Sequence, residues 1–341
     1  MTPENLSKKG KLFKPRDAKL FKPRNSLGNT GGQFYVAKNP TYGAVFTYHL
    51  KDVPKTSKSK RIQSERKLNS DKKDVPFPGY KALSDEMNEK PASIILTIKD
   101  SNGNLINNVK KNASNGSGRI AWNLRHKSYY PIRSGSFRGG WGWSPSGPYA
   151  TPGDYQAELF LENNGSIEKL DGPINFSVKP LRESTLKGAS YDEYNRFRER
   201  VSGLFINISK YEDVFSIIGN KIQLLEKASM QLESFSPDII AKISDFKDRY
   251  NDYEYENDSS PARDEIGEWY KPNLGARIRI AMQGLSTSYG PTELNSSNLE
   301  IAEKHFEKMK NEVEQLNKEV KDLENEVKQL NPPYIIGQGI D

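Results

Sequence analysis

Apolar and polar residues alternate along two stretches in the middle of the chain. Within residues 118–125, Ile120, Trp122 and Leu124 alternate with smaller or polar residues, and the same period of two runs through residues 155–161. Such alternation places each apolar set on one face of a strand. We therefore expect an antiparallel β-sandwich, with Trp122 in its core and its ring nitrogen hydrogen-bonded at the edge of that core.

Further strands are expected on both sides of these two. They cover residues 39–52, 93–100, 104–109 and 174–178. The residues between the second and third of them, Ser101-Asn102-Gly103, form a hairpin turn. Residues 54–74 are a highly charged insertion that we expect to form a short exposed helix, and residues 75–79 are an extended connector held by two prolines.

After residue 190 the apolar period changes to about 3.5, which is typical of a narrow seam between packed helices. One seam runs from Tyr194 to Leu225 and the other from Leu299 to Leu330, with two shorter helices and an acidic loop at residues 253–273 between them. We expect the two long helices to pair antiparallel in a four-helix bundle within one monomer. The alternative is a homodimeric coiled coil built by the last helix.

The first 36 residues are polar and basic, and they contain a tandem repeat, KLFKPRDA followed by KLFKPRNS. We expect this segment, residues 1–36, to be disordered. The expected organisation is then an immunoglobulin-like sandwich over residues 37–182 with the charged insertion 54–74, a helical bundle over residues 185–333 and a tail over residues 334–341.

Composition narrows the possible chemistry. The chain of 341 residues has a mean hydropathy of −0.80 and no cysteine, so it has no disulfide framework and no thiol nucleophile. No apolar run is long enough for a membrane span. The net charge of +7 is concentrated in residues 1–73, where 18 basic residues face 5 acidic ones. We interpret this basic arm as a solvated tail and loop rather than a nucleic-acid site, because no recognition motif accompanies it.

Several sequence segments occur in a recognisable order within the first 180 residues of the chain. They are LFKPR, NPTYGAVFTYHLKD, VPFPG, SIILTIKDSNGN, GRIAWNLR, GPYATPGDYQAEL and FSVKP. Together they resemble the region that follows the β-propeller in bacterial sortilin-like, BNR-repeat "glycosyl hydrolase-like" proteins. The sandwich is similar to the FlgD-type immunoglobulin-like domain, and the helical part, including GPTELN at residues 290–295, is similar to that family's C-terminal bundle.

The resemblance covers most of residues 17–333 but includes no propeller and no Asp box. It therefore implies a non-catalytic accessory module that supports or docks a β-propeller, and the family's hydrolase label transfers to no residue of this chain. The alternatives are a carbohydrate-binding module and a fragment of a secreted glycosyl hydrolase-like enzyme. The family is exported, whereas the first residues of this chain lack a signal-peptide pattern, so the compartment stays open.

No catalytic, cofactor-binding or metal-binding set emerges from the sequence. The three histidines, His49, His126 and His305, are far apart and have no ligands at metal spacing around them. Carboxylates are plentiful, but no pair stands out as the two that a glycosidase requires. We expect no enzyme activity, no cofactor and no metal.

One loop has chemical promise as a contact surface. Residues 134–147 read SGSFRGGWGWSPSG, and their candidate contact residues are Phe137, Arg138, Trp141 and Trp143. Tryptophans on a glycine-rich loop can dock against a protein or stack on sugar rings. We favour docking to a partner such as the propeller, or coverage of one end of the sandwich, over binding of a glycan.

Overall fold

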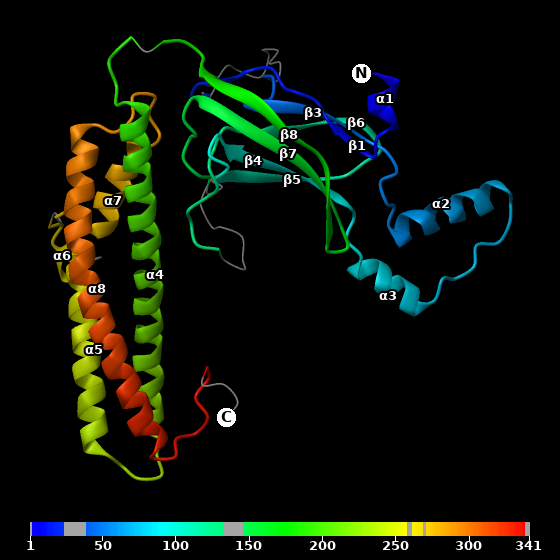
Figure 1. Ribbon diagram of the computed structural model, residues 1–341. Helices are drawn as coiled ribbons and strands as arrows, with labels where there is room; N and C mark the ends of the chain where they lie inside the picture. Colours follow the sequence, from blue (N-terminus) through cyan, green and yellow to red (C-terminus); the bar gives the residue numbers. More distant parts are fainter. Residues whose placement is uncertain are drawn as a thin grey trace. The chain divides into compact units, whose positions relative to one another are not determined.

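The computed structural model shows a mixed α and β protein with antiparallel sheets and a helical C-terminal region (Figure 1). It describes residues 2–23, 39–132, 146–183, 185–257, 261–268 and 271–337. The chain divides into two compact units. The first comprises residues 1–128 and 145–186, and the second comprises residues 129–144 and 187–341.

The first unit contains two β-sheets. The three-stranded sheet has the order β1 (Gly10–Leu12), β3 (Ala44–Leu50) and β6 (Gly116–Trp122). The five-stranded sheet has the order β2 (Ala18–Leu20), β8 (Ser166–Pro180), β7 (Gly153–Asn163), β4 (Ser93–Asp100) and β5 (Leu105–Asn112). All neighbouring strands are antiparallel except β2 and β8, which are parallel.

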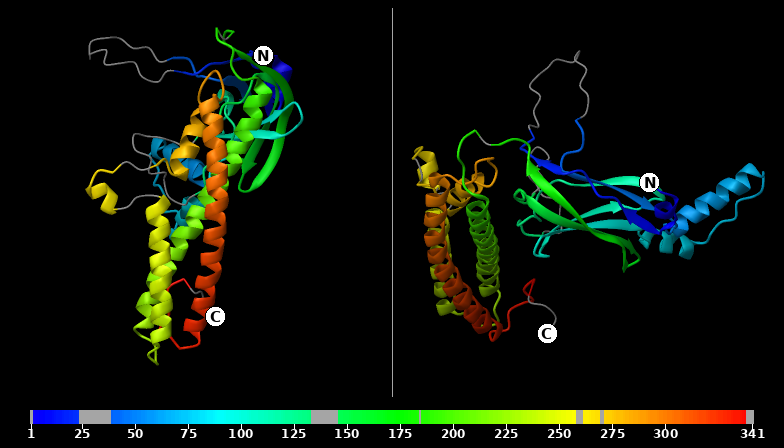
Figure 2. Two further views of the ribbon diagram at one scale, coloured as in Figure 1. Left: turned by 90° about the vertical axis from the view of Figure 1, so that its left-hand side faces the viewer. Right: turned by 45° about the horizontal axis from the view of Figure 1, so that its top comes forward.

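Figure 2 shows the strands of this unit from two further sides. One hydrophobic core contains residues from both sheets. Alternate residues of β3 are buried, and its Phe46 meets Phe176 of β8 edge to face at 5.1 Å. Trp122 is fully buried, and its Nε1–H donates to the carbonyl of Arg125 at 2.8 Å. The prediction that Trp122 is a core residue with its ring nitrogen satisfied is therefore confirmed.

The N-terminal segment contradicts the expectation of disorder over the part that the structure describes. The first repeat contributes Lys11 and Leu12 to β1, and the second contributes Lys19 and Leu20 to β2. Leu12 is fully buried, and its N–H donates to Asp171 Oδ2 at 2.7 Å. Each copy therefore adds an edge strand to a different sheet, which its polar composition did not indicate. Residues 24–36 lie outside the described residues.

The insertion between β3 and β4 carries two helices. The predicted exposed helix is confirmed as α2 (Ser57–Ser70), which has no buried residue. A second helix, α3 (Tyr80–Asn88), was not predicted, and it also has no buried residue. The Arg61 guanidinium joins them, because it contacts Glu86 at 2.8 Å and Glu65 at 2.5 Å. A short helix, α1 (Pro3–Ser7), precedes β1.

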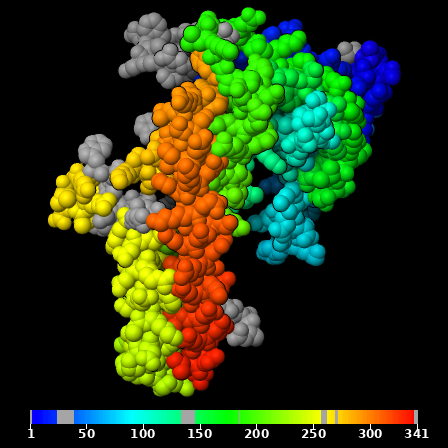
Figure 3. Space-filling model, turned by 60° about the vertical axis from the view of Figure 1, so that its left-hand side comes forward, coloured from blue at the N-terminus to red at the C-terminus, as the bar shows by residue number. Residues whose placement is uncertain are grey.

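The second unit is helical. Its helices are α4 (Tyr191–Ser229), α5 (Pro237–Asn257), α6 (Pro261–Glu265), α7 (Leu274–Gln283) and α8 (Glu293–Lys328). Capping boxes begin α4, where Ser190 pairs with Glu193, and α8, where Thr292 pairs with Asn295. The predicted seams of both long helices supply the core of this unit. Figure 3 shows α5 and α8 lying alongside each other.

The two long helices run parallel, which corrects the antiparallel pairing expected from the sequence. Arg200 contacts Glu303 at 2.8 Å and Lys221 contacts Glu324 at 2.6 Å, so both partners advance along the chain together. Helix α5 runs opposite to both, since it returns the chain towards the beginning of α4. There the Tyr194 hydroxyl donates to the Leu285 carbonyl at 3.2 Å, just before α8 begins.

No helix in the described part of the chain is long and apolar enough to cross a membrane.

Candidate functional site

The sequence-predicted contact residues belong to a loop that the structure does not describe. Phe137, Arg138, Trp141 and Trp143 all lie within residues 133–145, outside the described residues. Their role in docking or glycan binding therefore stays a prediction. The two ends of this loop are described, and they show how it is held.

Hydrogen bonds join the residues on either side of the loop in the first unit. The His126 N–H donates to the Pro148 carbonyl at 2.9 Å, and the Arg125 guanidinium donates to the Gly147 carbonyl at 2.9 Å. The same guanidinium lies 3.8 Å from the centre of the Tyr149 ring. A Cβ at Gly147 would lie 2.2 Å from the His126 carbonyl oxygen, so only glycine allows this approach. These contacts hold residues 125–126 against residues 147–149.

Two aromatic residues just before the loop belong to the second unit. Tyr129 and Tyr130 stack on each other, and both rings meet Phe205 of α4, at 5.3 and 4.9 Å. Burial raises the pKa of the Tyr130 hydroxyl. The two rings therefore pack against a helix of the second unit.

The histidines occupy separate elements. His49 lies on β3, where its Nδ1 is 3.2 Å from the Ser117 hydroxyl, His126 lies at the loop base, and His305 lies on α8. Across the residues that the structure describes, no three His, Asp or Glu side chains are grouped to hold a metal ion.

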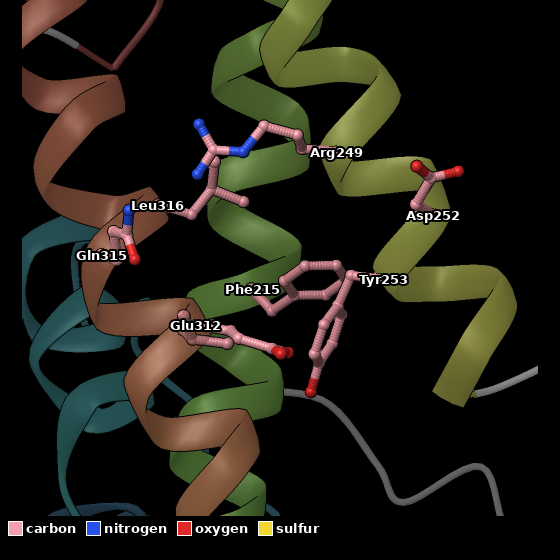
Figure 4. Close-up of a pocket in the computed structure, with 8 residues that line it drawn as sticks. Phe215, Arg249, Asp252, Tyr253, Glu312, Gln315 and Leu316 are labelled. Atoms are coloured by element: carbon pink, nitrogen blue, oxygen red, sulfur yellow. The ribbon is translucent and has the colours of Figure 1, made fainter.

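A hollow of about 290 Å³ opens in the second unit between α4, α5 and α8 (Figure 4). Phe215 stacks face to face on Tyr250 at 4.2 Å and meets Tyr253 at 4.7 Å. Arg249 at the rim is held by Glu319 at 2.6 Å, and Glu312 Oε2 is buried without a hydrogen-bond partner. The hollow is slightly smaller than usual small-molecule sites, and its carboxylates and aromatic rings offer contacts to a small polar or cationic group.

Sequence reasoning misses this hollow because the acidic composition of residues 253–273 predicts a loop that includes Tyr253. Helix α5 continues to Asn257, so the tyrosine is helical and lies over Phe215. The available signal was the spacing of Phe246, Tyr250 and Tyr253, which continues the apolar face of α5 by steps of four and three.

Comparison with known proteins identifies no family for this chain. No family model matches it, and no curated protein matches it. Among solved structures, a chain described as "pT26-6p" aligns with 85% of this chain at 12% identity and a TM-score of 0.13. The alignment spans 46% of that chain. A likeness this weak carries no argument about fold or function.

Proposed function

We propose that this chain is a non-catalytic accessory module of the sortilin-like, BNR-propeller type, which supports or docks a β-propeller. In this proposal the first unit is an immunoglobulin-like sandwich of the FlgD type, and the second unit is its helical companion. The observation that carries the proposal is the strand connectivity of the first unit, because it bears on the fold that the resemblance implies.

The strand order supports an immunoglobulin-like assignment. In such sandwiches the strands named A, B and E share one sheet, and C, F and G share the other. Here β1, β3 and β6 take the places of A, B and E, while β4, β7 and β8 take the places of C, F and G. Strand β5 extends the second sheet beside β4, as the strand named C′ does in variable-type domains.

A tyrosine near the start of β7 adds to this support. The Tyr155 hydroxyl donates to the Thr151 carbonyl, four residues upstream, at 2.6 Å. A tyrosine near the start of strand F that bonds back to the upstream backbone is a hallmark of the fold. One feature departs from the antibody pattern, since the buried Trp122 lies on β6, in the place of strand E rather than C.

A binding experiment tests the accessory role. The full chain is titrated calorimetrically with a recombinant β-propeller from a bacterial sortilin-like protein, and an unrelated propeller of the WD40 type serves as the control. We expect saturable binding to the first propeller only. The proposal fails if neither propeller binds, or if the chain alone releases product from a panel of chromogenic glycosides and a single carboxylate substitution abolishes that release.

A further inference from the structure

A basic groove of about 1390 Å³ lies on the first unit. Its floor is the face of β3 and β6 that points away from the core, where Thr47 pairs with Arg119 across the two strands. Residues 14–23 and the end of β5 form its sides. The groove is larger than the roughly 300–1,000 Å³ of small-molecule pockets, so it has room for a segment of a polymer.

The charge of the groove is strongly positive. The basic residues that line it are Lys14, Arg16, Lys19, Lys110, Lys111 and Arg119. The acidic residue among its described lining is Asp17, which is already paired with Lys179, and that hydrogen bond lowers the pKa of its carboxyl group. Lys110 is likewise paired with Glu162, at 3.0 Å.

The other basic side chains of the groove are less neutralised by acidic groups. Within the described residues Lys14, Arg16, Lys19 and Arg119 form no ion pair, and the sequence from residue 18 to residue 51 contains no Asp or Glu. Asp17 attracts Lys14 and Lys19 without forming an ion pair with either of them, so the four cations have room for an external anion. Arginine forks bind carboxylates through two parallel hydrogen bonds, and the lysines act as adjustable point charges.

The uncharged residues that line the groove indicate which class of anionic polymer it could bind. Phe21 is 42% exposed and meets Tyr42 edge to face at 4.9 Å, while burial raises the pKa of Tyr42 to about 12, so this hydroxyl stays neutral. Single-stranded nucleic acids need a series of aromatic platforms for successive bases, and the described lining presents one exposed ring. Thr41 and Thr47 instead offer hydroxyl groups between the cations.

We propose that this basic groove binds a carboxylated polysaccharide, with Arg16 and Arg119 on its uronate carboxylates and Phe21 against one sugar ring. The site is independent of the accessory role, since it needs no propeller. Neighbouring hydroxyl groups of the sugar chain meet the threonine side chains of the groove, and the anionic groups replace the missing counter-charges.

The test uses the full chain and fluorescently labelled hexagalacturonate, with binding followed by anisotropy at roughly physiological salt. The variant Arg16→Gln/Arg119→Gln removes two groove cations. Its matched control is Lys58→Gln/Arg66→Gln on α2, which removes the same charge from an exposed helix that is not part of the groove lining. Circular dichroism and melting temperature establish that both variants are folded.

We expect the groove variant to weaken binding by about tenfold or more, because two bidentate contacts are lost. The control should bind like the wild type, and neutral maltohexaose should not compete. Equal losses in both variants would show general charge attraction and overturn the proposal. The proposal would also be overturned if hexagalacturonate did not bind, or if maltohexaose competed with it. Tighter binding of oligo(dT), lost in the groove variant, would assign the groove to nucleic acid instead.

Discussion

Trp122 is the residue whose environment the sequence predicts most completely, and its removal should be costly. Its ring is fully buried among Tyr155 and Phe176, at 5.2 and 6.1 Å. We expect Trp122→Ala to lower the free energy of unfolding by about 3–5 kcal/mol, as truncation of large core aromatics does. Chemical denaturation measures this, with the 63%-exposed Phe77 truncated to alanine as the control. Similar losses in the two variants would contradict the core assignment.

Glu158 should make the first unit sensitive to acid. Its carboxylate is held by Lys169 at 2.5 Å and Lys99 at 2.6 Å, and these hydrogen bonds lower the pKa of the Glu158 carboxyl group. A lowered folded-state pKa stabilises the protein above the unfolded value of about 4.3, and that stabilisation is lost as pH falls through the folded value.

The comparison of wild type with Glu158→Gln isolates this effect. Between pH 6 and pH 3 the wild type should lose about 1 kcal/mol more of its unfolding free energy than the variant, because the pair is partly exposed and screened. Urea denaturation across this range measures the difference. Identical pH profiles would show that the lysine contacts contribute nothing to stability.

At the scale of single residues, alternation predicts burial well and predicts partners poorly. It identifies Phe46 and Ile120 as core residues because a period of two fixes which face they share. It cannot identify the partners of Glu158, because those lysines come from two other strands. The hollow at Phe215 also joins three helices that are distant in sequence, so only their register in space brings its residues together.

The two copies of the repeat offer a matched pair at the scale of the element. Leu12 is fully buried in β1, whereas Leu20, at the same place in the second copy, is partly buried in β2. We expect Leu12→Ala to cost about 3 kcal/mol of unfolding free energy and Leu20→Ala clearly less, because the lost burial is smaller. Denaturation of both variants measures this. A larger loss for Leu20 would contradict the burial of β1.

The sequence pattern could not predict the strands β1 and β2 or the relative direction of the two long helices, and both failures have physical reasons. Strands β1 and β2 have only three residues each, too few for alternation to rise above a polar background. The apolar residues of the long helices also do not show whether the helices pair parallel or antiparallel. A run of apolar residues at steps of three and four shows which face is buried but not the direction of the partner helix. The connection through α5 sets that direction.

Cysteine pairs can test the parallel arrangement, since the chain contains no native cysteine. The variants Arg200→Cys/Glu303→Cys and Lys221→Cys/Glu324→Cys place thiols at positions that are adjacent in the structure. A short bismaleimide should join each pair within one chain, as mass spectrometry of the cross-linked peptides would show. In an antiparallel bundle Arg200→Cys/Glu324→Cys would be joined instead, and that product would refute the parallel pairing.

At the scale of the whole molecule, each unit has a hydrophobic core of its own, and the core of the second unit bears on oligomeric state. The apolar seam of α8, including Leu299, Val313 and Val320, is buried against helices of the same chain. A homodimer through this seam would have to expose the matching residues of α4, at a cost of about 25 cal/mol for each Å² of apolar surface.

We therefore expect the full chain to be a monomer, as its sequence already suggested. Partners within one chain meet at a much higher effective concentration than a second copy provides. Sedimentation at micromolar concentration should give the mass of one chain, and the melting temperature of the helical signal should not change across a hundredfold range of about 1–100 μM, because mass action does not enter. The variant Lys221→Ala, which removes an inter-helix ion pair, should melt lower but equally independently of concentration. A melting temperature that rises with concentration would show instead that α8 pairs between chains.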